Sequence, residues 1–180
     1  MRINATFGIN GGFMKKSFIV ALLVITSAAH AGWDYSEDTD RMTSKTMTFA
    51  RINSDNSLGL GFPYKGDNYG KITVRQHPKE GLDVIIRIDK GQILCSSYSG
   101  CPVEIRFDDK PAIRFSGTPA GDHSSEYVFL KNAPRFISEA KKAKRILVSM
   151  NIYKSGAPLL EFTSIPPLDW GKKSPVALKK

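Results

Sequence analysis

The sequence has only two cysteines and three histidines, which leaves few side chains for a metal centre. Once a predicted leader that contains His30 is removed, only His77 and His123 remain beside Cys95 and Cys101. A structural zinc site takes four ligands at characteristic spacings, and neither histidine stands at such a spacing from the cysteines. We therefore expect no metal and no cofactor.

The chain also lacks an apolar run of the roughly 20 residues that a membrane-spanning helix needs. Its longest run, residues 17–27, is about half that length. Lys15 and Lys16 precede this run and Ala29-His30-Ala31 follows it, which is the order of a secretory signal peptide. We predict a signal peptide at 14–31 and no transmembrane anchor in the mature chain, and we expect a periplasmic or secreted protein.

Residues 1–13 carry no structural pattern, and a signal peptide does not need them. The codons of Gly11 and Gly12 are purine-rich and would stand where a ribosome-binding site precedes Met14. We interpret 1–13 as an upstream extension and expect translation to start at Met14.

A basic stripe interleaved with aromatic residues is missing as well. Removing Arg2, Lys15 and Lys16 lowers the formal charge from +9 to +6, and four of the remaining lysines lie in a tail at 172–180. Acidic and basic residues nearly balance in 32–171. The high pI therefore belongs to the leader and tail, and we expect no nucleic-acid partner.

Cys95 and Cys101 enclose five residues, among them Tyr98 and Gly100. In an oxidising compartment two cysteines at this spacing typically form a structural disulfide. We predict this bond, and we expect the enclosed loop to bow outward.

Strand patterns dominate the predicted mature domain, residues 32–171. Residues 84–88 and 103–108 alternate apolar with polar side chains, which indicates one buried and one wet face. Further strands are expected at 46–53, 58–62, 71–76, 93–94, 112–116, 126–131, 145–153 and 159–165, with a turn at 54–56. Residues 33–41 do not alternate, and we expect a short helical or extended lead-in anchored by Trp33 and Tyr35.

One helix is predicted, at about 132–145. Asn132 can cap it, Pro134 stands in its first turn, and Phe136, Ile137 and Ala140 fall on one face. Short strands at regular spacing with one helix predict a mostly β fold, either an antiparallel β-sandwich or a partly open barrel. No repeat or linker divides the domain, and we expect the tail 172–180 to be disordered.

Several short motifs follow one another in a recognisable order along the chain. Trp33-x-Tyr35 is followed by Asp40-x-Met42, then by Gly91-Gln92 before Cys95, by Arg106-Phe107-Asp108-Asp109 after Cys101, and by Leu168-x-Trp170. This order of motifs resembles uncharacterised exported β-rich proteins of Gram-negative bacteria and their prophages. Its layout is also similar to invasion-associated locus B proteins and to periplasmic accessory proteins of type VI secretion. The resemblance implies export and a β-rich fold, and it implies no activity.

Catalytic chemistry would have to use the histidines. His77 precedes Pro78 at a strand end, and His123 stands in a polar loop with Asp122, Ser124 and Ser125. No nucleophile-elbow pattern surrounds a serine. Asp108 and Asp109 could join Asp122, His123 or Glu126 in a cation site, although paired acids at a strand end more often open a turn. We expect no catalytic residue and no enzyme; the alternative is an envelope hydrolase that uses His123 or His77.

Tyrosines in expected loops favour recognition, because such residues are enriched at protein contacts. Tyr98, Tyr64 and Tyr69 are the candidate partner contacts. We therefore expect an exported, non-enzymatic protein-binding or accessory module whose partner is an envelope or phage protein.

The signal sequence makes the first testable prediction. Mass spectrometry of the protein isolated from the periplasm should find a mature N-terminus at Gly32 or within a few residues of it. A chain that retains residues upstream of Met14 would contradict the assignment.

Overall fold

The computed structural model describes residues 32–96 and 98–171 of the 180-residue chain. The predicted upstream extension (1–13), signal peptide (14–31) and disordered tail (172–180) lie outside the described residues. These three assignments therefore stay predictions.

Within the described residues the chain forms nine strands and one helix. The strands are β1 (Asp34–Thr39), β2 (Thr46–Ser57), β3 (Tyr69–His77), β4 (Gly81–Ile88), β5 (Cys101–Phe107), β6 (Ile113–Pro119), β7 (Tyr127–Leu130), β8 (Ile146–Met150) and β9 (Leu159–Phe162), and the helix is α1 (Ala133–Ala140). The mostly β fold with a single helix is confirmed.

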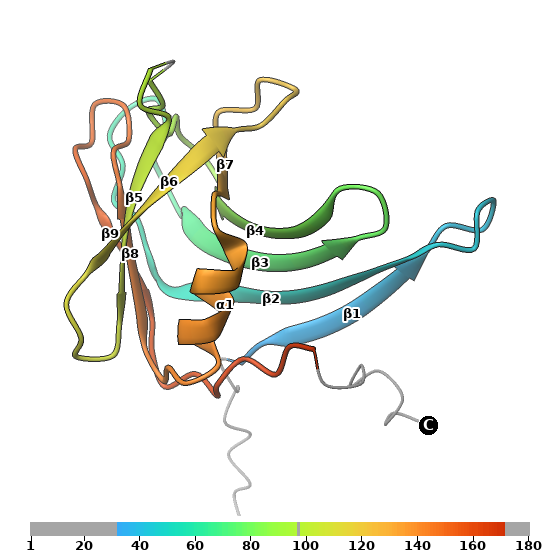
Figure 1. The fold of residues 1–180 in the computed structure, drawn as a ribbon. Helices are drawn as coiled ribbons and strands as arrows, with labels where there is room; N and C mark the ends of the chain where they lie inside the picture. Colours follow the sequence, from blue (N-terminus) through green and yellow to red (C-terminus); the bar gives the residue numbers. More distant parts are fainter. Residues whose placement is uncertain (1–31, 97, 172–180) are drawn as a thin grey trace, which may run out of the picture.

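The described strands belong to one antiparallel sheet, in the order β1-β2-β3-β4-β7-β6-β5-β8-β9. The sheet curves strongly, so that β5, β6, β8 and β9 stand at a steep angle to the long strands β1–β4 (Figure 1). It bends back on itself without closing into a barrel. No helix in the described ranges is long and apolar enough to span a membrane.

The core lies on the inner face of this bend, where the apolar side chains of each strand fall at every second residue. The strand register aligns them as two rows across β2, β3 and β4, Ala50–Val74–Val84 and Ile52–Ile72–Ile86. Helix α1 adds Phe136, which is 0% exposed and meets the rings of Phe107 and Phe115 edge-on, at centroid distances of 5.5 and 6.4 Å. The predicted alternation therefore identifies the core.

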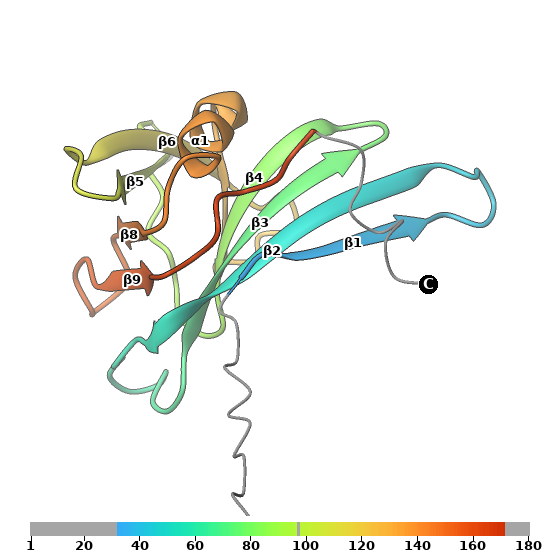
Figure 2. The ribbon, with the colours of Figure 1, turned by 90° about the horizontal axis from the view of Figure 1, so that it is seen from below.

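The lead-in at 33–41 is extended rather than helical, because β1 pairs with β2 along its whole length, from Asp34–Arg51 to Thr39–Thr46. Trp33 is buried and Tyr35 packs against the core, as expected of anchors. After β9 the chain runs past α1 toward the long strands (Figure 2), where the Asp169 N–H donates to the Tyr35 hydroxyl at 2.9 Å. Both ends of the domain are thereby tied together.

The expected turn at 54–56 is wrong: these residues continue β2, with a register shift against β3 between Asn53 and Ser57. The short polar side chains that favour turns here bond to backbone instead. The Ser54 hydroxyl donates to Asn56 O at 2.7 Å and accepts from Gly70 N at 2.9 Å. The register shift stays inside β2 because the polar groups of these residues have hydrogen-bond partners.

This bulged part of β2 also holds the last strand of the sheet. The Asn56 side chain donates to Leu159 O and accepts from Glu161 N, both at 2.8 Å. Its amide thereby supplies the hydrogen bonds that the backbone of a neighbouring strand would give to β9. The Asp55 carboxylate accepts from the backbone N–H and the hydroxyl of Thr163. Side chains rather than a backbone ladder therefore join β9 to β2.

The strand expected at 58–62 is also wrong. Leu58 and Leu60 are buried, as the alternation predicted, but their backbone amides bond to Asn68 O and Leu58 O within the loop. Phe62, the third apolar position, is 80% exposed. The segment is a loop with two apolar anchors.

The helix is shorter than predicted and ends at Ala140. Asn132 caps it by accepting from Arg135 N, as expected. Beyond Ala140, the Asp108 carboxylate accepts from the backbone amides of Lys144 and Arg145 at 2.9 and 3.0 Å, and Leu168 N donates to Ala140 O. These long-range bonds take groups that a longer helix would pair internally.

The Asn56 contacts predict a loss of stability. Asn56→Ala should lower the free energy of unfolding by about 1–2 kcal/mol, because it removes two bonds to the β9 backbone. Asn53→Ala is the matched control, since Asn53 lies exposed on the same strand. Equal losses for both variants in chemical denaturation would show that the Asn56 bonds contribute nothing.

Candidate partner-binding end

The predicted disulfide between Cys95 and Cys101 is present, with the sulfur atoms 2.02 Å apart. Inside it, Ser96 and Gly100 exchange two backbone hydrogen bonds of 2.8 Å, and the Ser96 hydroxyl accepts from Tyr98 N and Ser99 N. Gly100 has a φ of +72°, and a Cβ there would lie 2.6 Å from Gly117 O. This disulfide loop (95–101) is closed twice, and it leaves Tyr98 100% exposed.

Four connections meet at one end of the sheet: 58–68, 89–100, 120–126 and 151–158. The disulfide loop is the last part of the 89–100 connection. We call the four connections the loop end; they lie at the upper side of Figure 1. The first part of the 89–100 connection, residues 89–94, contacts the other three connections. Ile93 forms a bridge with Ile152, and Ile93 N donates to Ser125 O at 2.8 Å. A Cβ on Gly91 would lie 3.1 Å from Leu60 and 3.5 Å from Ile152, so the chains pack tightly there.

Asn68 fixes the 58–68 connection to this centre. It is 0% exposed, and its amide donates to Lys90 O at 2.7 Å and accepts from Lys90 N at 3.0 Å. A buried amide must find such partners, because an unpaired one costs about 1–3 kcal/mol. Tyr64 and Tyr69, on either side of Asn68, therefore lie on a segment that this buried, hydrogen-bonded amide anchors.

Exposed apolar side chains concentrate at the loop end. Among the described residues, seven large hydrophobic side chains are classed as exposed, and six of them lie on these connections or on the first residue of the strand that follows. They are Phe62 (80%), Tyr69 (40%), Leu94 (45%), Tyr98 (100%), Tyr153 (43%) and Leu159 (42%). The seventh, Met42 (92%), lies on the β1–β2 connection.

The three tyrosines singled out from the sequence differ in availability. Tyr98 is fully exposed, and Tyr69 borders a hollow of about 440 Å³ with Lys71 and Asp89. Tyr64 is half-buried and packs against the core, so it offers less surface. Partner contact by any of them stays a prediction.

Sequence reasoning missed Phe62, Leu94 and Tyr153 as surface residues. Leu94 and Tyr153 follow the buried residues Ile93 and Ile152, so strict period-two alternation would have turned both outward. Phe62 gave the opposite signal, because alternation with Leu58 and Leu60 placed it inside.

The two histidines occupy different turns. The His77 ring accepts from the backbone amides of Lys79 and Glu80 at its Nδ1, which caps the β3–β4 turn. His123 lies exposed in the β6–β7 connection with a φ of +66°. Its neighbour Asp122 bonds the side chain and backbone of Ser124, and these bonds lower the pKa of that carboxyl. Asp122 thus orients Ser124 rather than the imidazole.

The acids considered for a cation site are not brought together. Asp108 and Asp109 lie on the β5–β6 connection, bonded to the backbone and guanidinium of Arg145, at the opposite end of β6 from Asp122 and His123. No group of three metal-ligating side chains occurs in the part of the chain that the structure describes.

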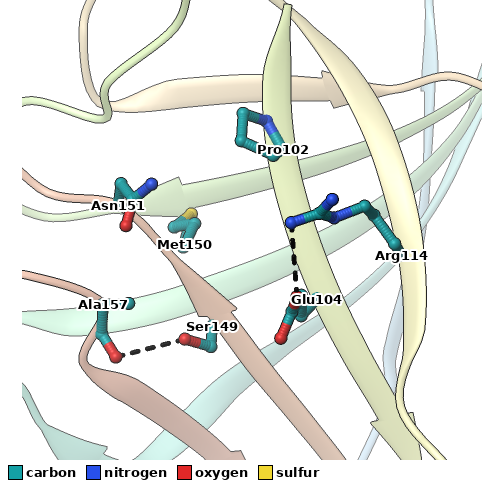
Figure 3. Close-up of a pocket in the computed structure, with 7 residues that line it drawn as sticks. All are labelled: Pro102, Glu104, Arg114, Ser149, Met150, Asn151 and Ala157. Carbon is teal, nitrogen blue, oxygen red and sulfur yellow. Dashed lines mark hydrogen bonds and ion pairs between the residues drawn. The ribbon is translucent and has the colours of Figure 1, made fainter.

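Two hollows flank Pro102, directly after the disulfide loop. One, of about 470 Å³, is lined by Ser99, Pro102, Arg114, Phe115 and Ser116. The other, of about 170 Å³, lies over β5 and β8 and is lined by Pro102, Glu104, Arg114, Ser149, Met150, Asn151 and Ala157 (Figure 3). Pro102 and Arg114 belong to both hollows, so the surface is continuous from the disulfide loop to β8.

No family model and no curated protein matches the chain. Among solved structures, invasion associated protein B from Bartonella henselae matches with a TM-score of 0.43 and 16% identity, covering 72% of this chain and 79% of that one. It belongs to a group whose layout the sequence resembles, and no residue or activity is carried over from it.

The disulfide predicts the behaviour of its double serine variant. Cys95→Ser with Cys101→Ser should lower the free energy of unfolding by about 1–3 kcal/mol, because the unfolded chain loses a constraint. A free-thiol assay on the purified protein should find no reactive thiol. Two reactive thiols in protein isolated from the periplasm would show that the bond does not form, and the bond would then no longer support a periplasmic location.

Proposed function

We propose that the protein is an exported, non-enzymatic binding module that acts in the periplasm and contacts an envelope or phage protein through its loop end. The observation that carries this proposal is the gathering of six exposed large hydrophobic side chains at one end of the described sheet. Exposed large apolar side chains that gather in one region favour a protein contact there. Tyrosine in particular is enriched where proteins meet.

Rigidity supports the same proposal. A flexible loop loses conformational freedom when it binds, whereas a constrained loop has lost it already. Tyr98 stands on a loop closed by the disulfide and by the Ser96–Gly100 hydrogen bonds. Elsewhere at the loop end, the buried Asn68 amide fixes the 58–68 connection.

The charge of the loop end favours a protein surface over a polyanion. Both signs of charge occur on its connections, with three lysines and four acids: Lys65, Lys90 and Lys154 beside Asp67, Asp89, Asp122 and Glu126. A nucleic-acid site would need an excess of cations. An apolar contact with a mixed polar rim is the usual anatomy of a protein–protein interface.

The disulfide supports the periplasmic assignment, because such bonds persist in oxidising compartments. It adds to the signal-peptide pattern, which is independent of it.

Photo-crosslinking tests the proposal directly. A photoreactive residue at position 98 or 153 should give one discrete adduct with another protein in the cells that produce this chain. The same residue at position 42 is the matched control, because Met42 is 92% exposed and apolar but lies away from the loop end. Equal adducts at position 42, or none at 98 and 153, would overturn the proposal.

A further inference from the structure

We propose that the hollow between the disulfide loop and β6 binds a carboxylate side chain of the partner protein, with Arg114 as its principal ligand. This inference rests on the proposed function and names the chemistry of the contact. The class of ligand is an acidic residue in an exposed segment of a protein.

The strand register builds the site. Pro102 pairs with Ser116 and Glu104 with Arg114 across β5 and β6, so these four side chains share the outer face of the sheet. The disulfide loop adds Ser99 to the wall of the larger hollow. Two strands and the disulfide loop therefore bring Arg114, Ser99 and Ser116 to one hollow.

Arg114 is less committed than six of the seven other arginines in the described chain; the seventh, Arg41, lies on the β1–β2 connection and lines neither hollow. Arg51, Arg75, Arg106 and Arg145 donate hydrogen bonds from their guanidinium groups, and Arg87 and Arg135 lie over aromatic rings. Arg114 instead has a side chain 77% exposed and one ion pair, to Glu104 at 3.7 Å. Its planar fork is thus free to take a carboxylate with two parallel hydrogen bonds.

Glu104 shows what the site accepts. Its carboxylate faces the guanidinium (Figure 3) at 3.7 Å, beyond hydrogen-bond reach, and its own side chain is 57% exposed. A partner carboxylate that reaches hydrogen-bond distance would displace this weak internal contact. Glu104 therefore competes with the ligand, and removing its charge should strengthen binding.

The same glutamate argues for a carboxylate over a phosphate. The two hollows offer one cation, Arg114, and one anion, Glu104, among the residues that line them. A dianion would meet repulsion from Glu104 with no second cation to offset it. A single negative charge fits, with the hydroxyl groups of Ser99 and Ser116 as further donors.

The test is an NMR titration of the mature protein with three probes. The first is a short peptide with blocked ends and one central glutamate, the second is the same peptide with glutamine, and the third is inorganic phosphate. The glutamate peptide should shift the Arg114 side-chain signal and the backbone signals of Ser99 and Ser116. Arg114→Gln should weaken its binding by about fivefold, and Glu104→Gln should strengthen it by about twofold.

Arg41→Gln is the control, because it removes the same charge from an exposed site on the β1–β2 connection and should leave binding unchanged. Equal binding of the glutamine peptide, tighter binding of phosphate, or no loss in Arg114→Gln would overturn the inference. Crosslinking at position 98 separates this failure from that of the proposed function. An adduct whose yield Arg114→Gln does not change would refute the Arg114 contact alone.

Discussion

The buried Asn68 amide is the interaction on which the loop end depends. Its two bonds to Lys90 join the connection before β3 to the connection after β4, at a point with no exposed surface. Around this point Gly91 leaves room for Leu60 and Ile152, and Ile93 pairs with Ile152. Because buried polar groups are costly to leave unpaired, this arrangement is strongly specified. The connections that carry the exposed aromatic residues of the loop end are built around this buried centre.

Side chains also replace backbone pairing at the sheet's last strand. Asn56 and Asp55 meet the outer backbone groups of β9, where an unprotected edge would invite another strand. The loop end is therefore built on a framework in which side chains of β2 cover the last strand of the sheet. Its exposed apolar residues are additions to that framework rather than parts of an incomplete core.

Much of the framework follows from period two in the sequence. The buried rows at Ala50–Val74–Val84 and Ile52–Ile72–Ile86 follow from alternation, and the disulfide follows from the cysteine spacing in a chain predicted to be exported. Two of the errors arise where a side chain bonds to distant backbone. Asn56 keeps a turn-like sequence inside β2, and Asp108 ends α1 early by taking the amides of Lys144 and Arg145. No local pattern contains those long-range partners.

The candidate site was predicted in part. Tyr98 follows from the cysteine loop, while Phe62 and Tyr153 depend on how connections far apart in sequence meet at Gly91. The most direct measurement is oxidative footprinting of side chains, which compares the purified protein with the protein in the cells that produce it. Contact at the loop end predicts that Tyr98 and Tyr153 become protected in the cell while Met42 stays as reactive as in the purified protein. Protection of Met42 with Tyr98 and Tyr153 still reactive would contradict the account.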